Sequence, residues 1–562
     1  MPGDERDAVV VPVGRRRLKD RLPVRLRHHW KPAGALCAGL AVATYFFGDA
    51  RVSPYVTSSS RVEADTITQN VKGTVDLYDA TVAHSIRLTY EQTDFDKMMK
   101  EFEDEGTKDY IAADLTIDGV HLENVGIRLK GNSTLMSLRG NGKGMPGGGR
   151  NMPGRAGAQQ DAPPAADQGA GGPGAAGGGP GGMVQYDLSP KKPEELPWLI
   201  KIDEYIEGRA YQGEREISLR PGVNEQVPLN EALSLSLTKV SGQPAEAYSF
   251  TSVRVNDRPV VSRLMVDNPD TEYAETVGDG NGVLYKARAG GSFAYRGDDP
   301  SEYEASFRQL NMVGSQDLSP VMKLIKWADE ASDKEFEQEL HEYVDVDSLA
   351  AYIATQNLLL NFDDVSGPGK NYLLWYDLDT RKFSVLGWDY NLTFSGDTAA
   401  GPDDKVGMGG AGGGRGRGRE GQQNGEGGPG QPEGGLPDMP EGMPEGMPEP
   451  PEGIEPPEGM PGGSNGGGNG EPGGRGDSMG GNALKDRFLE SDAFDALYKA
   501  AYQKVYAKTF ASDTAVEALD TIAEQAREAA GSSKELDTAV EKLRTTVTER
   551  TAALAKNKQV TG

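Results

Sequence analysis

Two blocks of low-complexity sequence constrain the fold more than any other feature, because they divide the patterned sequence into separate pieces. The first, about residues 140–183, is rich in Gly, Pro, Ala and Gln, and the second, 397–480, is Gly-rich and then repeats Met-Pro-Glu-Gly units. Neither composition offers enough apolar side chains to offset the entropy of ordering the chain. We therefore expect two disordered insertions, which are solvated loops in the simpler interpretation and cell-wall- or protein-binding arms in the alternative.

The overall composition excludes several kinds of chemistry. The 562-residue chain has a formal net charge of -27, which argues against a general nucleic-acid binder, because phosphate contacts need clustered Lys and Arg. A single cysteine, Cys37, leaves no disulfide framework and no cysteine zinc site. The five histidines are scattered and form no HExxH pattern. Any chemistry must therefore rest on carboxylates, amides, lysines and arginines, and a local pocket for a nucleotide and a metal is not excluded.

The N-terminal region is typical of a membrane anchor. Residues 1–31 are rich in Arg and Lys, and residues 32–48 form an apolar stretch near the lower limit for crossing a bilayer. The positive-inside rule places segment 1–31 in the cytoplasm and the bulk of the chain outside it. We expect a single-pass protein of the cell membrane with a transmembrane helix at 32–48. The alternative is a cleaved signal peptide, although no convincing cleavage site follows Phe47.

The sequence outside these segments predicts an α+β fold with a strand-rich first half and a helix-rich second half. Hairpins are expected at Asp118-Gly119, at Asn256-Asp257 and around Asp377-Leu378-Asp379, because these turn residues separate apolar runs. Other strands are predicted at 85–90, 198–205 and 216–219. Helices are predicted at 94–102, 230–240, 345–360 and throughout 482–556. Two lobes with a cleft between them would provide a natural ligand site.

The densest group of polar residues lies between 361 and 391. The predicted helix 345–360 delivers Asp363 at its C-terminal end, and a Gly-Pro-Gly loop leads to Asn371. The following hairpin ends at Asp389 and Asn391. Carboxylates and amides that converge from separate elements suit Mg²⁺ and phosphoryl transfer. The alternative is a solvated acidic loop and a hairpin turn, since Asp and Asn are ordinary turn residues.

A second group of residues could contact phosphate. Arg128 and Lys130 lie at the end of a predicted strand that runs into a Gly-Asn-Ser turn, whose backbone N–H groups could face an anion. Lys201 and Lys286 each lie among apolar residues of a strand, and Glu231 opens the helix 230–240 and could pair with either lysine. A solvated strand position for each lysine, and a favourable helix N-terminal position for Glu231, are the alternatives.

Several segments, which follow one another in the family's order along the chain, resemble the spore-coat protein H (CotH) family of atypical, kinase-like proteins. They include Asn-Val-Gly-Ile-Arg-Leu-Lys-Gly-Asn-Ser at 124–133, Leu-Ile-Lys-Ile-Asp at 199–203, Leu-Tyr-Lys at 284–286, and the sequence Trp-Asp-Tyr-Asn-Leu-Thr-Phe at 388–394. Asn361-Phe362-Asp363 and Asn371-Tyr372 fall between them in the family's order. The resemblance covers about 70–396, with 140–183 as an insertion, and resumes over 482–556 after the insertion 397–480.

This resemblance implies a two-lobed, kinase-like fold that uses ATP with Mg²⁺ or Mn²⁺ to phosphorylate Ser or Thr of envelope or secreted proteins. By position, Asp363 is similar to the catalytic aspartate, and Asp389 to the metal-binding aspartate. Further metal ligands would be Asn371 and Asn391, and the residues facing nucleotide would be Arg128, Lys130, Lys201, Glu231 and Lys286. Asn391 departs from the family pattern, in which many members have a second Asp. Asp364, adjacent to Asp363, lies outside the pattern.

Two other functions remain open. The first is a catalytically inactive, membrane-anchored adaptor of the cell envelope. This function fits the expected location outside the cytoplasm, because ATP is scarce there. Carbohydrate binding at the wall has only the exposed aromatic residues in its favour. The presence together of Asp363, Asn371 and Asp389 favours chemistry.

Overall fold

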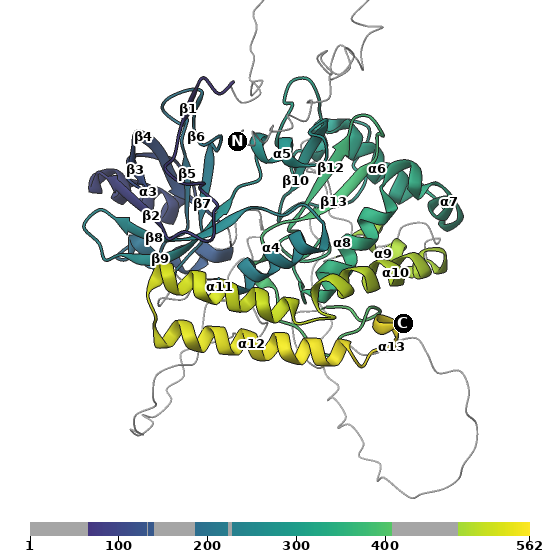
Figure 1. The fold of residues 1–562 in the computed structure, drawn as a ribbon. Coiled ribbons are helices and arrows are strands. Elements are labelled where there is room, and N and C mark those ends of the chain that lie inside the picture. The colour runs from purple at the N-terminus through teal and green to yellow at the C-terminus, as the bar shows by residue number, and fades with distance from the viewer. Residues whose placement is uncertain (1–65, 132, 140–185, 223–227, 407–480) are drawn as a thin grey trace, which may run out of the picture. The chain divides into compact units, whose positions relative to one another are not determined.

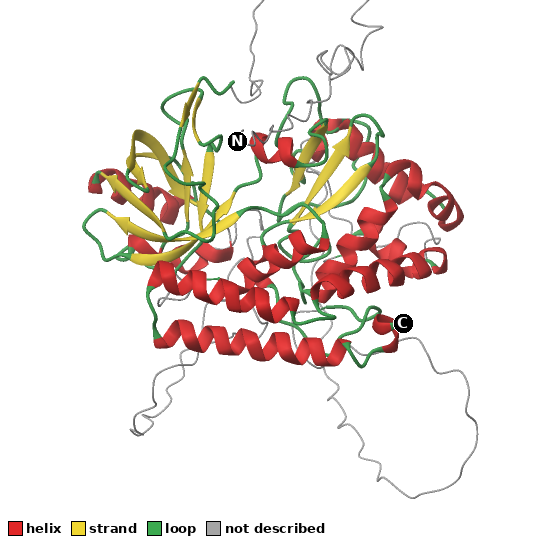
Figure 2. Cartoon of the chain, in the orientation of Figure 1, coloured by secondary structure: helices red, strands yellow, loops and turns green. Residues whose placement is uncertain are grey.

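The computed structural model describes residues 66–131, 133–139, 186–222, 228–406 and 481–562 (Figure 1). The predicted cytoplasmic segment 1–31, the predicted span 32–48, the block 140–183 and most of the block 397–480 lie outside these ranges. Among the described residues, no helix is both long enough and apolar enough to cross a membrane. The described chain mixes sheets and helices, which confirms the α+β class (Figure 2).

The first half of the chain forms a closed β-barrel. Its strands follow the order β2 (His84–Tyr90), β3 (Ile111–Ile117), β4 (Val120–Leu129), β5 (Trp198–Lys201), β7 (Glu216–Leu219), β9 (Val261–Asp267) and β8 (Tyr248–Val255). Neighbours pair antiparallel except β2 and β8, whose parallel pairing closes the barrel. Alternate side chains of β2 are buried, as a strand with one face on the core requires. The helix α3 (Gln92–Glu105) also buries Phe95, Met98 and Phe102 in this core.

The predicted hairpins are confirmed, and their turns explain the registers. β3 and β4 meet at Asp118 and Gly119, which have φ of 48° and 84°. β8 and β9 meet at Asn256, which has φ of 46°. Asn and Asp tolerate this left-handed region better than most side chains, and Gly occupies it freely. The strand predicted at 198–205 is shorter than expected, because β5 ends at Lys201 and the chain then turns.

A second, four-stranded antiparallel sheet has the order β11 (Phe307–Gln309), β10 (Gly282–Ala287), β12 (Tyr372–Asp377) and β13 (Phe383–Gly387). β10 therefore pairs with a strand that lies about ninety residues further along the chain, at β12. A small parallel pair joins β1 (Gln69–Val71) to β6 (Arg209–Tyr211). Figure 2 shows the barrel and the second sheet as separate groups of strands.

Helices supply most of the second core. They are α4 (Leu229–Ser241), α5 (Thr271–Thr276), α6 (Ser319–Glu330), α7 (Asp333–Tyr343), α8 (Val346–Leu358), α9 (Ala483–Glu490), α10 (Asp492–Thr509), α11 (Thr514–Ala530), α12 (Lys534–Leu554) and α13 (Lys558–Thr561). α10 packs on α8, and α11 packs on α4 and β8 (Figure 1). The sequence after the second block therefore completes a core begun before it, as predicted for 482–556.

The ordered chain continues beyond 396, where the second low-complexity block was expected to begin. The fully buried Arg550 of α12 donates hydrogen bonds to the backbone oxygens of Thr398 and Ala400. Asn357 of α8 donates to the oxygens of Gly401 and Asp404, both at 3.1 Å. Composition did not reveal this, because the backbone of 397–406 is held by partners from distant helices.

Candidate functional site

The loop after α8 holds Asp363 in a fixed, buried position. Asn361 donates to Gln356 Oε1 at 2.7 Å, and its own side-chain oxygen accepts from the backbone N–H of Asp363 at 3.0 Å. The Asp363 carboxylate, 5% exposed as a residue, accepts from the backbone N–H of Gly369 and from Asn371 Nδ2, the latter at 2.9 Å. Each carboxylate oxygen of Asp363 therefore accepts a hydrogen bond from a residue of the same loop.

Glycine is required where this loop folds back on Asp363. A Cβ on Gly367 would lie 2.3 Å from the Asp363 Cα, and one on Gly369 would lie 2.3 Å from Asp363 Oδ2. Both distances are far below van der Waals contact, so any larger residue would push the loop from the carboxylate. The predicted Gly-Pro-Gly loop thus has a defined purpose: it lets the backbone approach Asp363 closely enough to donate a hydrogen bond.

Asp389 lies at the end of the second sheet, next to the same loop. It follows β13 and Trp388 and adopts φ 55° and ψ 64°, a left-handed conformation that is uncommon for residues other than Gly. Its backbone oxygen lies 3.4 Å from Asn371 Nδ2, so the Asn371 amide links the two aspartates. Asp389 Oδ1 is buried, accepts no hydrogen bond within the described chain, and lies 3.4 Å from Arg220 Nη2.

A buried ion pair borders Asp389. Arg220, which follows β7, pairs through Nη2 with Glu231 Oε1 in the first turn of α4. Burial by itself would lower the pKa of Arg220, but Glu231 and Asp389 outweigh it and raise that pKa above its usual range. Arg220 therefore carries a permanent positive charge between two carboxylates. The sequence predicted that Glu231 forms an ion pair with a lysine, whereas in the structure its partner is Arg220.

Two lysines converge on the ring of Trp388. Lys286 of β10 places Nζ 3.2 Å from the ring centroid, and Lys130, just after β4, places Nζ 5.7 Å from it. Lys130 also donates to Asn268 Oδ1 at 2.6 Å. Burial lowers the pKa of Lys286 to about 7 and holds that of Lys130 well below its usual range. A bound anion would stabilise the charged form of both, so the arrangement suits phosphate.

The other predicted phosphate-binding residues lie in a neighbouring group. Lys201 pairs with Glu204 at 2.8 Å, and its Nζ lies 5.7 Å from the ring centroid of Tyr110. The guanidinium of Arg128 lies 5.1 Å from the same ring. Arg128 lies near the end of β4, and Lys130 follows the last residue of that strand. The structure therefore brings Lys130, Glu231, Lys286, Asp363, Asn371 and Asp389 together, and places Arg128 and Lys201 at Tyr110.

The side-chain oxygens of the residues that follow β13 are of the kind that Mg²⁺ binds. Asn391 lies in the short 3-10 helix Tyr390–Leu392, and its Oδ1 is buried without a hydrogen-bond partner in the described chain, like Asp389 Oδ1. Within the described ranges, no three His, Cys, Asp or Glu side chains gather to hold a metal by themselves. Mg²⁺ needs no such cage, because it commonly takes one or two carboxylates and completes its shell with water and phosphate oxygens.

Sequence reasoning missed three polar residues here. Arg220 was visible only as the residue after a predicted strand, and Asn268 only as a turn residue. Glu246 gave no signal at all, yet it is 3% exposed and neither of its carboxylate oxygens has a hydrogen-bond partner in the described structure. Burial raises the pKa of Glu246 to about 7, and Arg220 opposes that rise.

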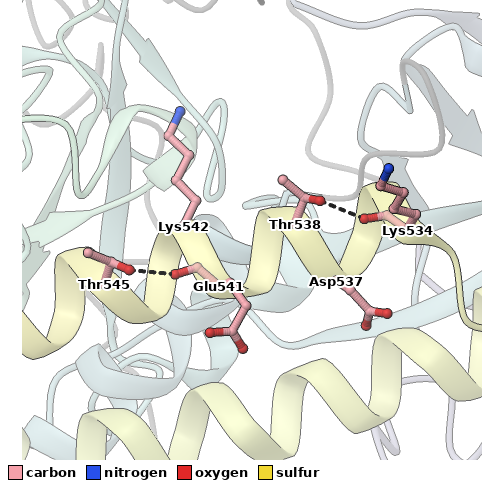
Figure 3. Close-up of a pocket in the computed structure, with 6 residues that line it drawn as sticks. All are labelled: Lys534, Asp537, Thr538, Glu541, Lys542 and Thr545. Atoms are coloured by element: carbon pink, nitrogen blue, oxygen red, sulfur yellow. Dashed lines mark hydrogen bonds between the residues drawn. The ribbon is translucent and has the colours of Figure 1, made fainter. Parts of the chain in front are cut away.

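A pocket on α12 shares no residue with this site. Figure 3 shows its lining, which comes from one helix and comprises Lys534, Asp537, Thr538, Glu541, Lys542 and Thr545. The hydrogen bonds drawn there run from Thr538 to the Lys534 oxygen at 2.7 Å and from Thr545 to the Glu541 oxygen at 2.9 Å. They are bonds within the helix, so the pocket contributes no converging chemistry.

Comparison with known proteins identifies the family to which this chain belongs. The family model described as CotH kinase protein matches residues 188–554, and the chain belongs to that family. The inner spore coat protein H of Bacillus subtilis (strain 168) is 23% identical over 198 residues, which cover 34% of this chain and 54% of that protein. The chain thus spans about half the length of this curated relative. The match confirms the family resemblance, and begins after Arg128 and Lys130.

Proposed function

We propose that this chain is an atypical protein kinase that transfers phosphate from ATP to Ser or Thr of envelope or secreted proteins, with Mg²⁺ or Mn²⁺. The observation that carries the proposal is the linkage of two aspartates from separate elements, Asp363 and Asp389, by the amide of Asn371. Membership of a family described as kinases supports it. In this proposal the barrel and the helical second half act as the two lobes of a kinase-like fold.

The residues around the two aspartates supply the remaining parts of a phosphoryl-transfer site. The oxygens of Asp389 and Asn391, with that of Asn371, would hold the metal, which neutralises charge on the phosphates when bound. Lys130 and Lys286 meet phosphate oxygens beside Trp388. Arg220 is held by Glu231 and lies beside Asp389, where its charge would help to orient the Asp389 carboxylate.

Asp363 orients the accepting hydroxyl and takes its proton. Its carboxylate is fixed by Gly369 and Asn371, so the position of the base is set before a substrate arrives. Burial raises the pKa of Asp363 to about 6, with Asp389 and Asp364 adding to the rise and the Gly369 N–H opposing it. A carboxylate whose pKa lies closer to neutrality is a better proton acceptor than an ordinary aspartate.

Nucleotide binding tests the proposal directly. A non-hydrolysable ATP analogue with Mg²⁺ should raise the melting temperature of the full chain by mass action, and the analogue without metal should raise it much less. Lys286→Met should reduce the shift, because it removes a cation at Trp388. Lys542→Met on α12 is the matched control and should leave the shift unchanged. If the wild-type chain binds no nucleotide with either metal, the inactive adaptor becomes the better description.

We further propose that the chain is anchored in the cell membrane by residues 32–48, with its bulk outside the cytoplasm. The basic segment 1–31 followed by an apolar stretch supports this arrangement. Protease added to protoplasts should then degrade the kinase-like part while the protein fractionates with membranes. A shortened, soluble chain that begins near residue 50 would show instead that the N-terminal segment is a cleaved signal.

A further inference from the structure

The chain that follows residues 407–480 returns directly to the Asp363 loop. Asn482, 2% exposed, caps α9 by accepting hydrogen bonds from the backbone N–H groups of Leu484 and Lys485 at 3.1 and 3.2 Å. Its side chain also hydrogen-bonds that of Tyr372, the first residue of β12. These bonds fix the first turn of α9 against the strand that continues from the loop. Lys485 is thereby presented to the loop from a rigid element.

Lys485 forms an ion pair with Asp364, the residue next to Asp363. The Asp364 side chain is 5% exposed and that of Lys485 is 19% exposed, so the pair is largely shielded from solvent. The same carboxylate accepts from the backbone N–H of Ser366 at 2.9 Å, and the Asp364 backbone oxygen accepts from Gly367 N–H at 2.9 Å. Asp364 therefore joins α9 to the turn that starts the loop.

That turn sets the position of Asp363. Gly367 lies against the Asp363 Cα, and Gly369 donates to the Asp363 carboxylate, so a shift of the turn would move both contacts. A buried carboxylate that loses its cation is strongly destabilised, because its charge is then uncompensated. Without Lys485, the Asp364 carboxylate would be expected to leave Ser366 and take the turn with it. Lys485 has no contact with Lys130, Lys286 or Asp389 among its described partners.

We propose that Lys485 is a positioning residue for Asp363, acting through Asp364 and the turn at 364–367. The inference rests on the proposed phosphoryl transfer and extends it. The site is completed by a residue from beyond the second low-complexity block. Asp364 lies outside the family pattern, which by itself suggested that its replacement would have little effect. In the structure, Asp364 instead connects α9 to the turn beside Asp363.

The test compares three variants of the full chain. Lys485→Met keeps the length of the side chain but removes its charge, and should lower kcat for phosphate transfer from ATP to dephosphorylated casein by about tenfold or more, since small misplacements of reacting groups cost up to about 100-fold. The KM for ATP and the thermal shift with the ATP analogue should stay within about twofold of wild type. Lys485→Arg, which retains the cation, should recover most of kcat. Lys499→Met, which breaks an exposed pair with Asp495 on α10, is the control and should be fully active.

Each other outcome counts against the inference. Full activity of Lys485→Met would overturn it, and so would loss of the nucleotide-induced thermal shift, because that would indicate a general collapse of the site. Failure of Lys485→Arg to recover activity would show that charge is not the property that matters. An active wild-type chain with any of these results overturns this inference alone, whereas a wild-type chain without phosphate transfer overturns the proposed function as well.

Discussion

Replacing Asp389 by Asn is expected to abolish the metal-dependent part of nucleotide binding. The substitution keeps the shape of the side chain but removes the charge of an oxygen that accepts no hydrogen bond within the described chain. Even residues that only support a metal's ligands contribute about 10–100-fold to metal affinity, so loss of a charged ligand should exceed that range. Isothermal titration of the full chain with the ATP analogue and Mg²⁺ measures the change.

The fold should survive this substitution. Arg220 retains Glu231 as its buried partner, and no apolar cavity is opened. Asp257→Asn, at an exposed position in the β8–β9 turn, is the matched control and should bind as the wild type does. Unchanged metal-dependent binding by Asp389→Asn, with the control also unchanged, would show that the metal is held elsewhere.

Replacing Asp363 by Asn is expected to leave nucleotide binding nearly unchanged and to lower kcat by about 10²–10⁴-fold, the usual contribution of a general base. The amide preserves volume and still offers an acceptor to the Gly369 N–H, but its NH2 group replaces the oxygen that accepts from Asn371 Nδ2. If the Asn371 amide turns to present its Oδ1, that hydrogen bond is restored and the loop should keep its conformation. What is lost is the atom that takes the proton of the accepting hydroxyl. Single-turnover phosphate transfer separates this effect from binding.

The dependence of kcat/KM on pH provides a second test of the role of Asp363 as a base. The pKa of Asp363 is raised to about 6, so the side chain is protonated and unable to accept a proton below that pH. The wild-type kcat/KM should therefore fall about tenfold for each pH unit below about 6. The residual activity of Asp363→Asn should lack this acidic limb. Asp329→Asn, exposed on α6, should retain both the rate and the limb, and an acidic limb that persists in Asp363→Asn would assign it to another group.

Local sequence signals predicted the elements that carry the site. Turn residues such as Asp118-Gly119 and Asn256-Asp257 predicted hairpins that the structure confirms, because Asp118, Gly119 and Asn256 adopt positive φ where the strands reverse. The helix predicted at 345–360 is α8, and Asp345 caps it by accepting from the Ser348 N–H at 3.0 Å. These features depend on residues a few positions apart, which a linear sequence displays directly.

The family resemblance predicted the residues of the proposed site, and the fold decided which of them lie close together. Lys130 follows β4 of the barrel, and Lys286 lies in β10 of the second sheet, yet both ammonium groups lie near one Trp ring, whereas Lys201 pairs with Glu204. The choice depends on the pairing of β4 with β5 and of β10 with β12, and both pairings join residues far apart in the sequence. No spacing rule reveals such pairings.

The sequence by itself determined the α+β class, the family, the hairpins and the main helices, and it predicted the two aspartates of the proposed site. Only the tertiary structure decided that the barrel closes through β2 and β8, that Glu231 is paired with Arg220, and that Asp364 depends on Lys485. The physical reason is burial. A buried charge requires a partner, but which side chain supplies it is set by the packing of elements distant in sequence, here from either side of a low-complexity block.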